Sequence, residues 1–515
     1  MKHGYRTYQW VLLIAALVIG FALRVHGILV LKDGLSHDES VSYLCAAATE
    51  GAYQERIDGM VDSTLVVGDI QAYYTRPATL QLGVVAYDLA HYDIHPPLYF
   101  WALHAVHVLF GAGIIGGTLL NLIAEFGVAL LMLLIAGRVL RHSVVAWAAV
   151  AIWYLSSAVV QIDLEARHYQ FLALFALASF LLQERILAGR SSRLQWALFI
   201  AVNALGLLTH YYFAFLLLPG AVLMLHRYGL KSPTLRFMGA GLASLGLFFL
   251  LFPEVFDFIP LYVDRVKDPA DAVGLFNRLR TFLYAALAFF AEVHVLRYVY
   301  LILLVAFTGL GIRSLWRIDR RLWTTEHPTV YYGLLMLWTG LFTFALYLIG
   351  VSPPHAVGEQ YLAYFWPLLA IMTVRVANRV IPARVQGWVL AAHMAQLGIS
   401  LPNAIAHSEY VQNVLPGSWY ARMAESEMVI MDDRKRSGLP RIIRHLPATL
   451  PLVIMSKEDP EVATYNAVSF LHLDVEGRPS IEPFLTRMSE AGFGQQAKEQ
   501  HDHYELISFR RDVLR

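Results

Sequence analysis

Long apolar runs constrain the fold of this chain more than any other feature. They lie at residues 10–31, 113–137, 143–162, 167–183, 235–252, 329–350 and 361–378. Each approaches the roughly 20 residues with which an α-helix crosses the hydrocarbon core of a bilayer. Of the 515 residues, 57% are hydrophobic and only 15% are charged, which is too little charge for the surface of a soluble protein. The sequence therefore predicts an all-α polytopic membrane protein.

Positive charge collects in some connections between these runs and is sparse or balanced in the others. Arginine-rich connections, such as those with Arg138/Arg141 and Arg375/Arg379, are expected in the cytoplasm together with the N-terminus. The connections expected outside lie at residues 32–112, 161–167, around Thr209-His210, 253–296 and 351–360. This alternation predicts about 11 spanning helices, the last near residues 385–402, with the C-terminal tail outside.

One apolar segment, Leu98–Phe110, is too short to span comfortably. As a span it would also place Arg138 and Arg141 outside, against the charge rule. We therefore expect an interfacial helix along the outer membrane surface, and the same for residues 281–296.

From about Asn403 the composition changes and charge rises. Strand-like runs and a helical stretch follow at Leu450–Met455, Tyr504–Phe509 and Ile481–Ala491. The sequence thus predicts a transmembrane domain over residues 1–402, with its first outer loop at 32–112, and a small extracytoplasmic α/β domain over residues 403–515.

Several classes of function are excluded by composition. The formal net charge of +1 gives no basic field that would recruit nucleic acid. Cys45 is the only cysteine, so an intrachain disulfide and a cysteine-rich metal site are excluded. The sequence has no glycine-rich phosphate loop, which argues against ATP-driven transport.

Polar residues gather in the connections that are expected outside. The candidate site residues are Asp38, Glu39, His95, Asp163, Glu165, Arg167, Tyr169, His210, His355 and Gln360. Transfer of a group from a lipid phosphate needs a carboxylate that accepts a proton from the incoming hydroxyl. It also needs cations or donors that stabilise the departing phosphate. Arg167 is the natural phosphate partner, and His95 or His210 could add donors.

Each of these residues also has a structural interpretation. Asp38 and Glu39 could be a solvated helix start, because carboxylates favour helix N-termini. Glu165 and Arg167 could form an ion pair that closes the bundle, and His210 could belong to an interfacial belt. The functional interpretation is favoured because all of these groups are expected on the same side of the membrane.

Three motifs resemble those of a known family: Asp38-Glu39, His95-Pro96-Pro97-Leu98-Tyr99 and Glu165-Ala166-Arg167-His168-Tyr169. They are similar to the protein O-mannosyltransferase and aminoarabinose (lipid A) transferase group of membrane glycosyltransferases with the GT-C fold. The resemblance implies a polyprenyl-phosphate-linked sugar donor, an inverting single displacement and an outward-facing site in a bacterial-type inner (cell) membrane.

By the same resemblance, Asp38 matches the catalytic aspartate that acts as base, and Glu39 accompanies it. Glu165 matches the acidic residue of the second outer loop. Arg167 and His95 match positions close to the lipid phosphate.

The sequence departs from the family pattern at two places. Many relatives have an arginine before the tyrosine-leucine that opens a late helix, whereas Gln360 stands here. The groups that could bind phosphate in its place are Arg265, Lys267 and His355. Asp163 stands where Ser-Gln is more usual before the Glu165 motif and could share the acidic role.

No cofactor is firmly implied by the sequence. Some aminoarabinose transferases bind zinc near the donor site, and His95, His210 and His355 could form such a set for a divalent metal, although their spacing is not diagnostic. The expected partners are the polyprenyl-phosphate sugar donor, membrane lipid and an extracytoplasmic acceptor, which is a glycolipid, a cell-wall glycan or a protein.

Two alternatives to the enzyme stay open. A secondary transporter would show related halves with broken helices at the midplane, but no such symmetry is evident and the ionisable residues cluster at one surface. A non-catalytic relative that binds polyprenyl lipid is the other alternative, which Gln360 leaves open.

Overall fold

The computed structural model describes most of the chain in two compact units. The described residues are 7–59, 63–74, 79–93, 95–257, 275–291, 302, 327–348, 360–408, 410–412, 414–432, 439–455, 462, 464–473 and 481–511. Unit 1 consists of Met1–Lys32, Leu89–Ala102 and Ile115–Val411. Unit 2 consists of Asp33–Asp88, Leu103–Ile114 and Gln412–Arg515. Each unit is described by itself below.

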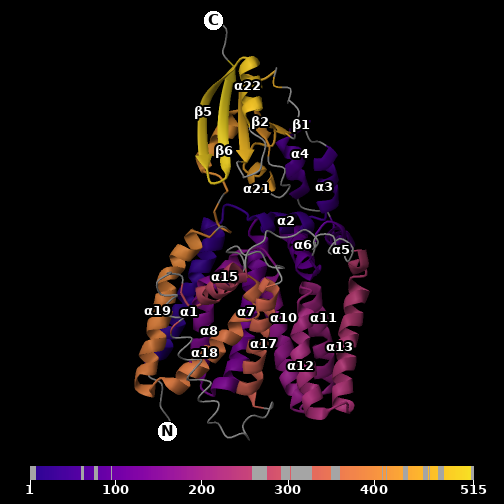
Figure 1. Cartoon of the computed structure of the whole chain (residues 1–515), viewed down its shortest axis with the longest axis vertical. Coiled ribbons are helices and arrows are strands. Elements are labelled where there is room, and N and C mark those ends of the chain that lie inside the picture. The colour runs from indigo at the N-terminus through magenta and orange to yellow at the C-terminus, as the bar shows by residue number, and fades with distance from the viewer. Residues whose placement is uncertain are drawn as a thin grey trace. The chain divides into compact units, whose positions relative to one another are not determined.

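Unit 1 is a helical bundle, in which α1, α8 and α19 pack together and α10, α11, α12 and α13 form a neighbouring group (Figure 1). Its elements are α1 (Thr7–His26), η1 (Gly27–Leu31), α7 (Gly116–Leu140), α8 (Ser143–Leu155), α9 (Ser157–Leu164), α10 (Tyr169–Leu187), α11 (Arg193–Thr209), α12 (Phe213–Tyr228), α13 (Ser232–Leu251), α15 (Leu275–Ala288), α17 (Pro328–Leu348), α18 (Trp366–Val380) and α19 (Ala383–Ala406). Helices α5 (Leu82–His91) and α6 (Leu98–Phe110) each contribute to both units.

The membrane class predicted from the apolar runs is confirmed. Within the described residues, six helices are long and apolar enough to cross a membrane, or seven if the bent pair α8–α9 is one span. Helices α11 and α12 are apolar but shorter. The chain is therefore a mostly helical multi-span membrane protein.

The apolar run at 143–162 does not form the straight helix that its composition predicts. The chain breaks at Ser156, whose backbone is extended with ψ of 130°. Helices α8 and α9 consequently meet at a bend of 60°. The short helix α9 redirects the chain and ends at Leu164, directly before Glu165.

Unit 2 is built on a six-stranded mixed sheet with the order β1-β3-β2-β4-β6-β5. Its elements are α2 (His37–Ala46), α3 (Glu50–Gly59), β1 (Thr64–Val66), α4 (Val67–Gln71), η2 (Ala72–Tyr74), α20 (Gly417–Glu425), β2 (Met428–Met431), α21 (Leu439–Ile443), β3 (Pro451–Ile454), β4 (Ala467–Leu473), α22 (Glu482–Glu490), β5 (Phe493–His501) and β6 (Tyr504–Arg511). Strands β3, β2 and β4 are parallel, and the other pairings are antiparallel. The strands predicted at Leu450–Met455 and Tyr504–Phe509 are confirmed as β3 and β6.

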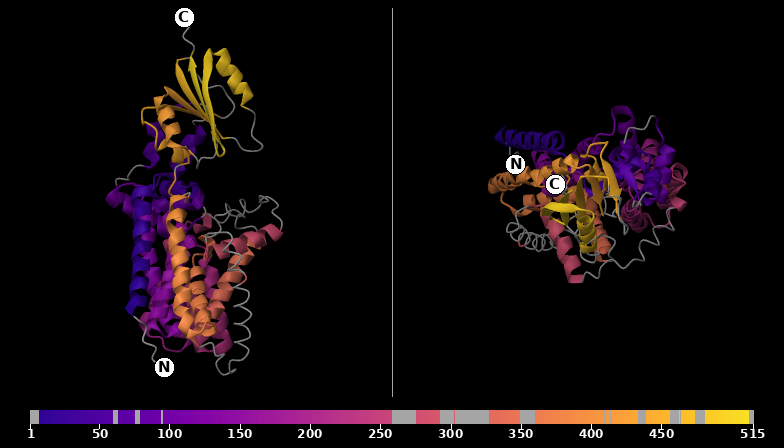
Figure 2. Two further views of the ribbon diagram at one scale, coloured as in Figure 1. Left: turned by 90° about the vertical axis from the view of Figure 1, so that its left-hand side faces the viewer. Right: turned by 90° about the horizontal axis from the view of Figure 1, so that it is seen from above.

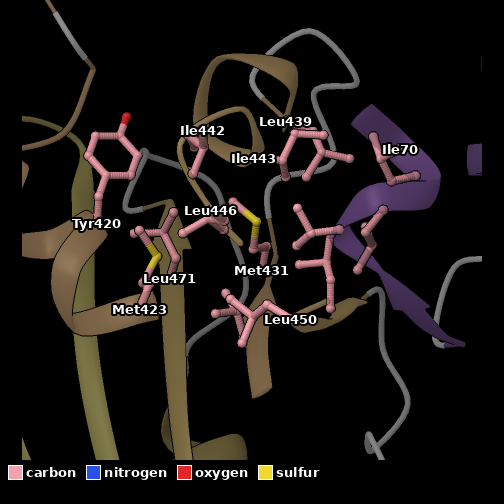
Figure 3. Close-up of a cluster of buried hydrophobic side chains, with 14 of the residues drawn as sticks. Ile70, Tyr420, Met423, Met431, Leu439, Ile442, Ile443, Leu446, Leu450 and Leu471 are labelled. Carbon is pink, nitrogen blue, oxygen red and sulfur yellow. The ribbon is translucent and has the colours of Figure 1, made fainter. Parts of the chain in front are cut away.

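Both faces of this sheet are covered, and β2 shows why. Successive side chains of a strand point to opposite faces. Met428 and Ile430 face the side on which Phe484 of α22 packs, and Figure 2 shows α22 against that face. Val429 and Met431 belong to a second hydrophobic cluster on the other face, part of which Figure 3 shows. Burial of apolar surface on both sides stabilises the sheet.

Strand β1 comes from residues 32–112, which the sequence predicts to be the first outer loop, and not from the C-terminal region. Leu65 is paired with Leu452 of β3, and Ile70 of α4 packs into the same cluster as Leu439 and Ile443 (Figure 3). Residues of the 32–112 segment and C-terminal residues therefore share one hydrophobic core. The boundary that the sequence predicts near residue 403 places this loop with the spans, whereas the compact unit joins it to Gln412–Arg515.

Candidate active site

Helix α2 carries Asp38 and Glu39 and begins with a capping box. The hydroxyl of Ser36 accepts a hydrogen bond from the backbone N–H of Glu39 at 3.2 Å. The Glu39 carboxylate in turn accepts one from the backbone N–H of Ser36 at 2.8 Å. This reciprocal arrangement satisfies two of the backbone donors that a helix start leaves without partners. Glu39 is fully buried in this role.

Asp38 differs from its neighbour. Its side chain is partly exposed, on the first turn of a helix whose N-terminus stabilises negative charge. Of the two adjacent carboxylates, Asp38 is therefore the accessible one, whereas Glu39 fixes the start of the helix. Both residues belong to unit 2, whereas the other described candidate residues belong to unit 1.

In unit 1, the loop between α9 and α10 holds Glu165, Arg167 and His168, all of them buried. Asn121 of α7 donates from its side-chain amide to the carbonyl oxygens of Ile162 and Glu165. The ammonium group of Lys32 donates to the carbonyl oxygen of Leu164 at 3.3 Å. These bonds to backbone atoms fix the path of the loop.

The loop also lies tightly against α7. A Cβ atom added at Gly117 would collide with the Cβ atom of Ala166, so only glycine fits at this position. The hydroxyl of Tyr99 donates to the carbonyl oxygen of Gly117 at 3.2 Å. The Glu165 motif is therefore held by close packing as well as by hydrogen bonds.

Asp163 forms a buried ion pair with Arg24. Its carboxylate accepts from Arg24 Nε at 2.7 Å and from the side-chain amide of Gln170. Arg24 also lies 3.0 Å from Glu125 of α7 and stacks on the ring of Tyr154. Asp163 is completely buried in this cluster, so its placement favours a structural role over contact with a substrate.

Arg24 and Glu125 were not among the residues that the sequence singled out. Each is a charged residue inside a long apolar run, and charges in such runs are costly unless they are paired or functional. That signal was available in the sequence, although it does not reveal which partner each charge takes.

Three histidines from three separate connections form a cluster. The ring centroids of His168 and His210 are 4.9 Å apart, as are those of His168 and His95. His95 and His210 are 6.4 Å apart, and Asp93 lies 3.2 Å from Nδ1 of His95. His168, which the sequence analysis placed only within a motif, is the central member.

The protonation of this cluster follows from its burial. Burial lowers the pKa of His210 to about 3, and the positive charges of His95 and Arg167 act in the same direction. Burial also lowers the pKa of His168, with His95, His210 and Arg167 adding to the effect. Both imidazoles are therefore neutral near pH 7, and each keeps one N–H that can donate.

The donor atom of one of these rings can be assigned. Nδ1 of His210 accepts a hydrogen bond from the backbone N–H of Tyr212 at 3.1 Å, so its proton resides on Nε2. His168 is fully buried, and neither of its ring nitrogens has a hydrogen-bond partner within the described part of the chain. Both rings can therefore offer an N–H to a bound group.

Tyrosines line the same region. The ring of Tyr361 lies 5.7 Å from that of Tyr169 and 6.1 Å from that of Tyr212. Gln360 directly precedes Tyr361, and its buried Oε1 has no partner among the described residues. The structure thus brings the Gln360 segment to the loop motif with Arg167 and to the connection after α11.

The three-histidine cluster is not arranged as a metal site. Among the described residues, no group of three or more histidine, cysteine, aspartate or glutamate side chains is placed to hold a metal ion. His355, the third member of the predicted set, lies outside the described residues, as do Arg265 and Lys267.

Comparison with known proteins gives a family match over part of the chain and several solved structures of similar fold. Residues 94–256 match the family described as dolichyl-phosphate-mannose-protein mannosyltransferase. Apo ArnT from Cupriavidus metallidurans is similar with a TM-score of 0.56 at 13% identity, over 98% of this chain and 97% of that chain. ArnT bound to undecaprenyl phosphate has a TM-score of 0.55 at 13% identity, over 98% of both chains.

A third similar structure is the archaeal oligosaccharyltransferase AglB from Archaeoglobus fulgidus in complex with an inhibitory peptide and a dolichol-phosphate. It has a TM-score of 0.47 at 12% identity, over 98% of this chain and 74% of that chain. No curated protein sequence matches the chain.

Proposed function

We propose that this chain, a GT-C membrane glycosyltransferase by its family match over residues 94–256 and its ArnT-like fold, transfers a sugar from a polyprenyl-phosphate donor to an extracytoplasmic acceptor. The reaction inverts the anomeric centre in a single displacement. The acceptor is a glycolipid, a cell-wall glycan or a protein.

The observation that carries this proposal is the buried guanidinium of Arg167 beside His168 and His210. A buried anion is stabilised only when charge-assisted hydrogen bonds replace water. Arg167 supplies the charge, and the two neutral imidazoles supply N–H donors without adding further charge. A phosphate that becomes more negative as it leaves is the group that such a site stabilises best.

In the proposed step, the acceptor hydroxyl attacks the anomeric carbon of the sugar. The bond between that carbon and the phosphate oxygen breaks, and its electron pair leaves on the polyprenyl phosphate beside Arg167. The carboxylate of Asp38 accepts the proton of the hydroxyl as general base. Glu165 orients the groups around Arg167, and Tyr169 and Gln360 bind the donor.

The proposed topology completes this scheme. The proposed topology has about 11 crossings in all, among them the longer spans and the shorter helices α11, α12 and α18, with the N-terminus cytoplasmic in a bacterial-type inner membrane. Helix α6 lies along the outer surface as an interfacial helix. The candidate site and the C-terminal domain face the outside.

The test measures release of free polyprenyl phosphate from a panel of polyprenyl-phosphate sugars by purified protein, with and without an envelope extract as acceptor. We expect release from one donor, reduced by about 100-fold or more in Asp38→Asn. Asp69→Asn, which changes an exposed carboxylate of the same unit, is the matched control and should behave as wild type.

Other outcomes point elsewhere. Donor binding without release from any donor would favour the non-catalytic lipid binder. Absence of donor binding, together with alternating accessibility of the site from both sides, would favour the transporter.

A further inference from the structure

The start of helix α2 is bonded to the C-terminal part of unit 2. The Nε atom of Arg441 in α21 donates a hydrogen bond to the backbone carbonyl oxygen of Leu35 at 2.8 Å. Leu35 directly precedes Ser36, which caps the helix that carries Asp38. A guanidinium from a residue some 400 positions later thus holds the backbone three residues before the proposed base.

A second guanidinium acts on the same segment. Burial lowers the pKa of Arg444, and the charges of Asp33 and Glu39 oppose this shift, as do Tyr43 and Tyr420. Arg444 therefore lies within electrostatic range of carboxylates on both sides of Asp38. Charge complementarity and the Arg441 bond favour the same position for the start of the helix.

The segment that bears Arg441 is itself fixed to the first outer loop. The side-chain amide of Gln71 donates to the carbonyl oxygens of Ile443 and Leu446, at 2.9 and 3.0 Å. The backbone N–H groups of Val67 and Gly68 donate to the carbonyl oxygens of Leu450 and Ala448. Ile70 of α4 also packs in the same hydrophobic cluster as residues of α21 (Figure 3).

We propose that the C-terminal domain positions Asp38, and that Arg441 is the positioning residue through which it does so. The proposal rests on the function proposed above. Arg441 acts on the backbone at Leu35 and touches no reacting atom. The domain is then part of the transfer machinery, because displacement of a general base by about 1 Å is enough to lose much of its effect.

The test compares Arg441→Ala with Arg422→Ala in the full-length protein. Arg422 is also in unit 2, where it pairs with Glu499 of β5 at 2.7 Å. We expect Arg441→Ala to lower kcat about tenfold with donor KM unchanged, because the donor site is intact. Arg441→Lys should recover part of the loss, and Arg422→Ala should retain wild-type kcat.

A double-mutant cycle separates positioning from general destabilisation. In an Asp38→Asn background, the base is already lost, so Arg441→Ala should cause no further decrease if it acts through Asp38. The same tenfold loss in both backgrounds, or a wild-type kcat in Arg441→Ala, would overturn the proposal.

Hydrogen exchange gives a readout that does not need activity. Amides in the first turn of α2 should exchange faster in Arg441→Ala than in Arg422→Ala. If the protein shows no donor-dependent release but this difference is found, the proposed function fails while the coupling stands. If Arg441→Ala does not fold, Gln71→Ala is the second variant, because it removes the two bonds that hold the α21 segment to α4. It should lower kcat and speed exchange in the first turn of α2 in the same way; unchanged kcat and exchange there would contradict the proposal.

Discussion

The carboxylate of Glu39 and the backbone N–H of Ser36 are 2.8 Å apart, in a bond that closes the first turn of α2. Glutamine keeps an oxygen that can accept this bond, so Glu39→Gln should retain transfer within about threefold of wild type. Glu39→Ala loses the cap and should destabilise unit 2 by about 1 kcal/mol. Turnover and thermal unfolding of both variants are the measurements. Loss of turnover in Glu39→Gln as large as in Asp38→Asn would instead make Glu39 a reacting group.

Arg167→Lys keeps the charge but replaces a planar fork of donors with a point charge. Because a lysine cannot reproduce two parallel bonds to a phosphate, we expect donor affinity to fall about 10- to 100-fold. Equilibrium binding of the donor checks this expectation. Arg138→Lys is the matched control, since Arg138 forms an ion pair with Glu184 at 2.7 Å elsewhere in unit 1. Equal affinity in the two variants would make Arg167 a structural residue.

The loss of stability should depend on which charged residue of the buried cluster around Arg24 is replaced. Arg24→Met leaves Asp163 and Glu125 buried without their cation, which should cost about 3–5 kcal/mol. Asp163→Asn leaves Arg24 paired with Glu125 and should cost less. Unfolding in detergent gives the ranking, and donor affinity per folded molecule should be unchanged in Asp163→Asn. Loss of donor affinity in Asp163→Asn would show that Asp163 belongs to the donor site.

Two glycines on α7 form a matched pair. Gly117→Ala forces the loop at Ala166 to move, because the added Cβ has no space. Gly137→Ala meets no atom within 4 Å and should be neutral or stabilise by up to about 1 kcal/mol. We expect only Gly117→Ala to lower both thermal stability and donor affinity. Similar behaviour of the two variants would show that the close packing does not control the site.

His210 should make stability depend on pH. Its pKa is about 3 in the folded protein, whereas an unfolded chain titrates near 6.5. Between these values the unfolded state binds a proton that the folded state excludes. The contribution of neutral His210 to the free energy of unfolding is therefore fully present above about pH 6.5. It falls by up to about 1.4 kcal/mol per pH unit as the pH is lowered toward 3.

The matched variant for this prediction is His210→Asn, which keeps an acceptor for the Tyr212 N–H and does not titrate. Thermal unfolding at pH 7, 6 and 5 should show a shallower decrease for the variant than for wild type. Parallel decreases would mean that His210 is not buried in its neutral form.

Much of the fold could be predicted from local patterns. The apolar runs predicted α1, α7, α10, α13 and other spans, because a helix in lipid must satisfy its own backbone. The resemblance to GT-C glycosyltransferases is confirmed by the family match over residues 94–256, which contains the motifs at His95 and Glu165 but not Asp38-Glu39. The Ser36-x-x-Glu39 spacing is a capping-box signature, so the role of Glu39 at the helix start was also available from the sequence.

Other features depend on contacts that no local pattern encodes. The break at Ser156 falls in a run with no glycine or proline, so neither of the residues that usually interrupt a helix predicts it. His168 acquires its role only because the connections before α6 and after α11 meet the loop after α9. Strand β1 has three residues, too few for a periodicity, and its partner lies far along the chain.

The pairing of Thr64 with Val453 sets an order of events during synthesis. About 390 residues must be made between the two partners, which takes roughly 20–80 s at about 5–20 residues per second. Until then the segment with Asp38 lacks its edge partner, while the spans that hold Arg167 are already made. If Arg167 and Asp38 have the roles proposed above, a nascent or truncated chain would complete its lipid-phosphate site before it positions its base, and would bind a donor before it could transfer the sugar.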